Sequence, residues 1–140
     1  MLNREVFYED PGHRALPNLG VARVAHPDSE QEWEKLQFEL SHFVSEGEYG
    51  DGLDRVLSTF LAYVGGAKQP AVWVSGFYGS GKSHFLRVLE HLWVDTTLPD
   101  GSSARGITEV PQSVQDDLRT LTAVGGRAGG LWSAAGTLDD

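Results

Sequence analysis

The chain has 140 residues with 11 basic and 20 acidic side chains, so its formal net charge is −9 and its pI is about 4.9. An apolar content of 40% is typical of a globular protein, and the absence of cysteine excludes a disulfide scaffold and thiolate metal sites. The acidic balance argues against direct nucleic-acid binding by this segment, and no apolar run is long enough to cross a membrane.

Residues 1–27 have a mixed composition, with prolines at positions 11, 17 and 27. This pattern predicts an irregular N-terminal arm. The arm also lacks the apolar core of a signal peptide, so we expect a cytoplasmic protein.

Residues 28–66 predict two acidic amphipathic helices that pack on the remainder of the chain. The first should begin near Ser29, because Ser29 and Glu32 have the spacing of a capping box. The second should follow residues 51–52, where apolar side chains recur at helical spacing until a glycine pair ends the pattern. Its apolar stripe consists of Leu53, Val56, Leu57, Phe60, Leu61 and Val64.

Residues 28–54 hold nine carboxylates and a single lysine. Such a concentration of charge most often forms the solvated outer face of helices. A docking surface for a basic partner is the alternative interpretation.

Residues 70–140 predict an α/β fold, specifically the start of a truncated P-loop NTPase domain of the AAA-like kind with an incomplete parallel sheet. The continuous apolar run at 71–74 predicts a buried strand over residues 71–75. A helix over 81–95 should follow a glycine loop, and a polar loop should fill 95–110. One more helix is predicted from Pro111 to about Ala123, before a glycine-rich end.

The glycine loop at residues 76–83 reads G-F-Y-G-S-G-K-S and matches the phosphate-binding pattern G-x-x-x-x-G-K-[ST]. Glycines let the backbone curl closely around phosphate oxygens, and the following helix directs its free N–H groups at the same oxygens. The lysine would contact the β- and γ-phosphates of ATP, and Ser83 would be a ligand of Mg²⁺. The predicted nucleotide-binding residues are Gly76, Phe77, Tyr78, Gly79, Ser80, Gly81, Lys82 and Ser83.

Hydrolysis needs a second strand that ends in an acidic residue, which would hold the metal and polarise water. No such run follows the glycine loop. The nearest apolar stretch, residues 120–124, is followed by a glycine. We therefore name no catalytic residue and expect a piece of a longer ATPase that binds nucleotide without hydrolysing it.

The segment V-W-V-S-G-F-Y-G-S-G-K-S-H-F-L at residues 72–86 resembles the large phage-resistance P-loop ATPases of the PglY/BrxC family, from phage growth limitation and BREX systems. The likeness extends over about residues 19–136 and includes L-P-D-G at 98–101 and R-A-G-G-L-W at 127–132. It implies ATP and Mg²⁺ as cofactors, other components of a phage-defence system as partners, and an ATPase of more than a thousand residues of which this chain would be the start.

Two other functions remain open. A small-molecule or nucleotide kinase uses the same loop, although the downstream arginines show no compact lid pattern. A non-catalytic interaction fragment would instead use the acidic helices to bind a partner.

Overall fold

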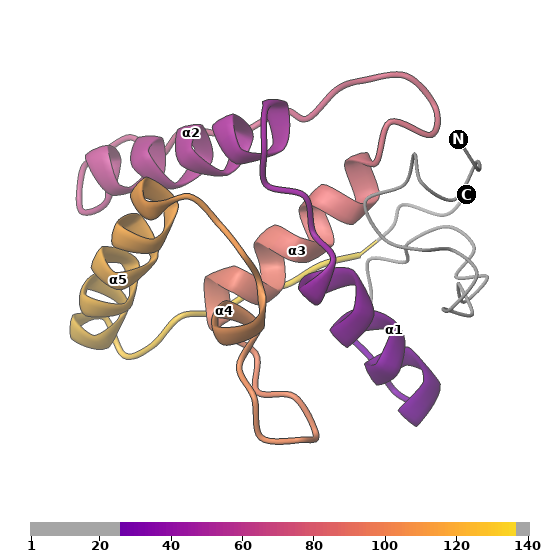
Figure 1. Ribbon diagram of the computed structural model, residues 1–140. Helices are drawn as coiled ribbons and strands as arrows, with labels where there is room; N and C mark the ends of the chain where they lie inside the picture. The colour runs from indigo at the N-terminus through magenta and orange to yellow at the C-terminus, as the bar shows by residue number, and fades with distance from the viewer. Residues whose placement is uncertain (1–25, 137–140) are drawn as a thin grey trace.

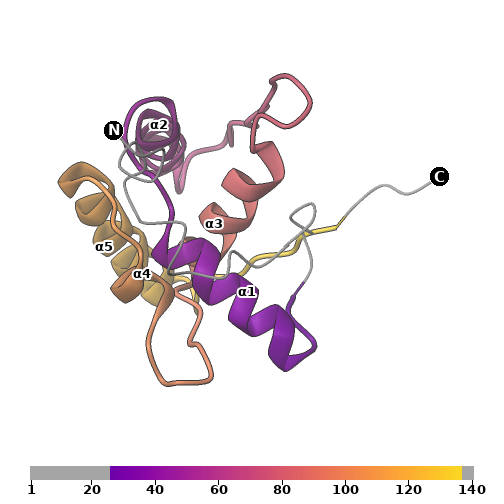
Figure 2. The same ribbon diagram turned by 45° about the vertical axis from the view of Figure 1, so that its right-hand side comes forward.

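The computed structural model describes residues 26–136, so the predicted arm at residues 1–27 lies almost wholly outside the described range. α3 lies in the middle of this part and contacts α1, α4 and α5, and α2 packs on α5 (Figures 1 and 2). None of the described helices is long and apolar enough to span a membrane. The helices are α1 (Glu30–Ser41), α2 (Glu48–Tyr63), α3 (Lys82–Val94), α4 (Ala104–Ile107) and α5 (Gln112–Arg127).

The predicted α/β fold with a strand at residues 71–75 is wrong for this chain. Between residues 26 and 136 there is no strand, and an isolated antiparallel bridge joins Thr97 to Ser103. The run at 71–75 is mostly exposed, with Val72 at 54% and Trp73 at 90% of full exposure. A strand needs a neighbour to pair its backbone groups, and the nearest apolar candidate, residues 120–124, lies inside α5.

The helix predicted from the capping box begins where expected. Ser29 is the N-cap of α1, and its hydroxyl accepts a hydrogen bond from the Glu32 N–H at 3.3 Å. The Glu32 carboxylate reaches back one residue further than a standard capping box and accepts from the Asp28 N–H at 3.2 Å. The start of α1 is thus determined by local hydrogen bonds.

The core is built mainly from leucines of α1, α2, α3 and α5. In α2, the stripe predicted from the sequence buries Leu53 and Leu57 completely, in the face that packs on α5. Burial of one such side chain contributes about 1.5–3 kcal/mol, so the helices are held chiefly by these contacts. The fully buried large side chains are Leu36, Leu40, Leu53, Leu57, Leu92, Leu121, Val88 and Val114.

α5 is longer than predicted, because the sequence indicated a loop from residue 125 onward. Gly125 lies in the last turn, and a Cβ there would stand 2.6 Å from Cγ of Leu131. The glycine therefore lets the chain after the helix fold back against it. The predicted polar loop at 95–110 also contains the short helix α4, capped by the Ser103 hydroxyl.

A buried ion pair links α1 to α3. Arg87 Nε lies 3.4 Å from Glu39 Oε2, and both side chains are less than 10% exposed. His91, one turn further along α3, is 3% exposed and its Nδ1 is 2.8 Å from the Thr96 hydroxyl. Burial lowers the pKa of His91 to about 4, with smaller contributions from the charges of Arg87 and His26.

Arg105 of α4 joins the end of α3 to the middle of α5. Its guanidinium donates to the carbonyl of Leu92 at 2.7 Å and to that of Trp93 at 2.9 Å, in the last turn of α3. It also donates to the carbonyl of Leu118 at 3.0 Å and to the Thr122 hydroxyl, both in α5. The positive charge of Arg105, next to the carbonyls of Leu92 and Trp93, also stabilises the negative end of the α3 dipole.

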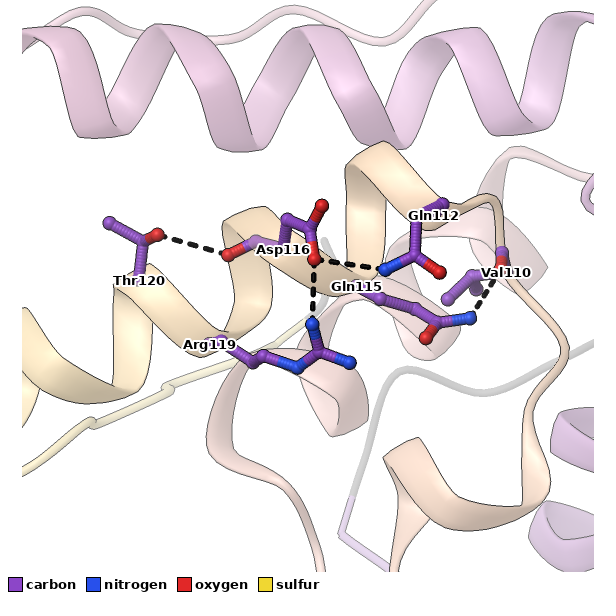
Figure 3. A network of polar contacts seen from close by, with 6 residues as sticks. All are labelled: Val110, Gln112, Gln115, Asp116, Arg119 and Thr120. Carbon is purple, nitrogen blue, oxygen red and sulfur yellow. Dashed lines mark hydrogen bonds and ion pairs between the residues drawn. The ribbon is translucent and has the colours of Figure 1, made fainter.

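Arg119 makes a contrasting, exposed set of contacts (Figure 3). Its guanidinium donates to the Asp116 carboxylate at 2.7 Å, and the amide of Gln112 donates to the same oxygen at 2.9 Å. The side chains of the Arg119–Asp116 pair are 69% and 58% exposed, so water competes for both. Such surface pairs contribute little to stability.

We expect Arg105→Lys to lower the free energy of unfolding by about 1.5–3 kcal/mol, because an ammonium cannot reach the acceptors on both helices. Arg119→Lys is the matched control and should change stability by less than about 0.5 kcal/mol. Urea denaturation of both variants measures the difference. Equal losses would show that Arg105 does not hold α3 to α5.

Acid should destabilise the protein through His91. The unfolded imidazole binds a proton near pH 6.5 and the folded one only near 4, so the unfolded state binds more protons between these values. Stability contributed by this group is complete above pH 6.5 and falls, by on the order of 3 kcal/mol, as the pH drops to 4. In urea denaturation at pH 7, 5.5 and 4.5, His91→Gln should show a shallower pH dependence than the wild type. Identical slopes would contradict the assignment.

Candidate functional site

The glycine loop at residues 76–83 connects an extended segment to α3, and the segment runs back along α2 before it turns (Figure 1). The N–H of Ser80 donates to the carbonyl of Phe77 at 3.1 Å and closes the turn. Gly79 and Gly81 both have a φ of +79°, a conformation that side chains with a Cβ rarely adopt. Gly81 is the N-cap of α3, so the left-handed residue sets the direction in which the helix leaves the loop.

The side chain of Lys82 lies inside this loop. Its ammonium donates to the carbonyl of Gly76 at 2.9 Å and to that of Phe77 at 2.6 Å, with the Ser80 hydroxyl at 3.4 Å. No ion pair joins Lys82 to a carboxylate anywhere between residues 26 and 136. Its positive charge is therefore held by the loop but is not neutralised there.

The start of α3 adds free donors beside this charge. The first N–H groups of a helix have no partner within the helix. Among residues 26–136, no acceptor is found for the N–H of Lys82, Ser83 or His84. An ammonium next to unpaired N–H groups at the positive end of a helix is an arrangement suited to an anion with several oxygens.

The backbone of the loop is closely packed, which fits a phosphate cradle. A Cβ at Gly76 would stand 2.7 Å from Oγ of Ser80, and one at Gly81 would collide with the Tyr49 hydroxyl. Larger residues would force the loop open at both points. The residues present therefore fit the phosphates of ATP.

Tyr49, in the first turn of α2, contacts the loop and was not among the predicted site residues. Its hydroxyl donates to the carbonyl of Ser80 at 2.7 Å, and its ring packs against Phe43 and Phe85 with centroids 5.9 and 6.2 Å away. The sequence carries no signal for this contact, because 31 positions separate the two residues.

The predicted site residues do not all converge. Gly76, Phe77, Ser80 and Lys82 come together, Phe77 through its backbone only. The rings of Phe77 and Tyr78 are 90% and 98% exposed and face solvent. Ser83 is half-buried in the first turn of α3, and its hydroxyl has no hydrogen-bond partner among the described residues.

No cluster of three or more His, Asp or Glu side chains able to hold a metal occurs within residues 26–136. A Mg²⁺ ion here would therefore take ligands from Ser83 and from the phosphates of its nucleotide, as hard cations at nucleotide sites usually do. His84 follows Ser83 in the first turn of α3 and is half-buried. Burial lowers its pKa, Glu39 partly opposes this, and Arg87 adds to it.

Comparison with known proteins gives no family that matches the chain and no solved structure that matches it.

We expect Tyr49→Phe to loosen the loop without disturbing the core, because the ring remains and only the hydroxyl is lost. Amide hydrogen exchange of Ser80, whose N–H bonds the Phe77 carbonyl, should accelerate, while global stability falls by about 0.5–1.5 kcal/mol, the value of one hydrogen bond. Tyr63→Phe, at an exposed position of the same helix, should change neither. Unaltered exchange in Tyr49→Phe would show that the hydroxyl does not restrain the loop.

Proposed function

We propose that this chain binds the triphosphate of ATP, together with Mg²⁺, on the loop at residues 76–83. The observation that carries the proposal is the ammonium of Lys82, held inside the loop at 2.6–2.9 Å from two carbonyls and beside the free N–H groups of α3. A positive charge held in place without a carboxylate partner favours an anionic ligand over a merely structural role for the lysine.

Each loop residue has a distinct role in this proposal. The free backbone N–H groups of Lys82 and Ser83 donate to phosphate oxygens, and the Lys82 ammonium compensates the β/γ charge. Ser83 contributes its hydroxyl to the metal, which when bound neutralises part of the phosphate charge. Phe77 and Tyr78 contribute backbone only to the phosphate cradle.

We further propose that the chain binds nucleotide without hydrolysing it. Turnover requires an acidic residue aimed at the metal from a neighbouring element. The apolar stretch at 120–124 does not provide one, because it belongs to α5 and is followed by Gly125. In this proposal, ATP hydrolysis belongs to a longer parent protein.

The motif around the loop supports a place in phage resistance. The resemblance of residues 72–86 to the PglY/BrxC ATPases points to a parent ATPase that acts in the cytoplasm with other components of a defence system. The same resemblance favours ATPase over the small-molecule or nucleotide kinase alternative.

An interaction role is the second candidate function, and one feature favours it. A groove of about 1360 Å³ between α2, α4 and α5 has four carboxylates and two arginines in its lining: Glu46, Asp51, Asp54, Glu109, Arg105 and Arg119. These carboxylates suit a basic partner, such as a lysine-rich peptide. Nucleotide titration separates the two functions, because this one needs no ATP.

Lys82→Ala should weaken Mg²⁺–ATP binding about 10- to 150-fold, the equivalent of losing one hydrogen bond to a charged group. Lys68→Ala removes an exposed lysine of the segment before the loop and is the matched control, expected to bind as the wild type does. Isothermal titration calorimetry measures both. Unchanged affinity in Lys82→Ala, or no binding by the wild type, would refute the phosphate site.

A further inference from the structure

A second groove, of about 540 Å³, begins at the glycine loop and continues along α2. Ser80 and Lys82 line one end of it, and Arg55 and Trp73 belong to the same lining. Its α2 wall comes from the first half of that helix, and the segment at residues 72–77 forms the other wall. This volume is in the range of small-molecule sites, so the groove can hold the remainder of a nucleotide whose phosphates occupy the loop.

Trp73 in the wall of this groove is unusually exposed. Its side chain is 90% exposed, although Trp rings are normally well buried. It makes no ring contact with another aromatic side chain of residues 26–136. The indole therefore offers a free π face next to the phosphate loop.

Arg55 contributes a cation to the same groove. Its side chain is exposed and forms no ion pair with a carboxylate in the described part of the chain. A guanidinium carries five donors in a planar fork, which can bond the oxygens and ring nitrogens of a nucleoside or stack on its base. The groove thus combines a stacking surface, a donor and a phosphate site in one continuous space.

We propose that the groove binds the base and ribose of the nucleotide, with the base stacked on Trp73 and Arg55 donating to the nucleoside. This inference rests on the proposed function, since the phosphate loop anchors the same ligand. Stacking recognises the flat face shared by all bases, so Trp73 raises affinity for nucleotides in general, and Arg55 contributes hydrogen bonds.

The test compares two ligands that share phosphates but differ in the base. Isothermal titration calorimetry on the full chain measures the affinity for Mg²⁺–ATP and for Mg²⁺–tripolyphosphate. Trp73→Ala should weaken ATP binding about 5- to 150-fold and leave tripolyphosphate binding unchanged. Trp132→Ala, which removes a similarly exposed indole (84%) from a separate groove beside α3, should change neither.

Further variants separate the failure of this inference from failure of the phosphate site. Lys82→Ala should lower the affinity for both ligands. Trp73→Phe should keep most of the ATP affinity that Trp73→Ala loses, because it retains an aromatic face. Suppose that Lys82→Ala weakens the binding of both ligands. If Trp73→Ala then leaves ATP affinity unchanged, or lowers the affinity for both ligands equally, the base does not lie on Trp73, although the phosphate site stands. If the wild type binds neither ligand, both proposals fall.

Discussion

The contacts of Arg105 determine how the long helices meet. One guanidinium bonds carbonyls at the end of α3 and a carbonyl and hydroxyl of α5, and the backbone N–H of the same residue donates to Asp95 at 3.0 Å. Two of its partners, the carbonyls of Leu92 and Trp93, lie in the last turn of α3, where a helix leaves its carbonyls unpaired, so removing the guanidinium would leave them unsatisfied. The leucine core supplies most of the burial energy, but it is non-directional. The hydrogen bonds of Arg105 are directional and therefore orient α3 relative to α5.

The orientation of α3 matters because the glycine loop leads directly into it. With the far end of α3 held by Arg105, its first turn comes to lie against the start of α2, where Tyr49 reaches the carbonyl of Ser80. The buried pair of Glu39 and Arg87 holds the middle of the same helix to α1. The loop is therefore exposed at its tip and restrained at its base, which suits a site that must admit a ligand and keep its donors aimed.

The charge at the loop is positive, whereas the net charge of the chain is negative. The protein carries a net charge of −9, which repels nucleotides at long range. At short range, Lys82, the N-terminus of α3 and Arg55 oppose this repulsion, and the groove has one acidic side chain in its lining, Glu48 of α2. Screening by salt weakens the long-range repulsion more than the contacts at close range. In the proposed complex, Lys82 would exchange its bonds to the carbonyls of Gly76 and Phe77 for bonds to phosphate oxygens, so these bonds would oppose part of the binding energy.

The sequence by itself determined those features that a few neighbouring residues control. The cap at Ser29, the buried leucines in the stripe of α2 and the start of α3 at Gly81 all depend on groups within about one or two helical turns, and they were predicted correctly. Only the tertiary structure decided what residues 71–75 became and which side chains surround the loop. A strand exists only when a partner pairs its backbone, and no such partner lies between residues 26 and 136, so an apolar run predicted as buried is exposed. Tyr49 and Ser80, or Glu39 and Arg87, meet across 31 to 48 positions because packing of whole helices brings them together, and no local pattern encodes that distance.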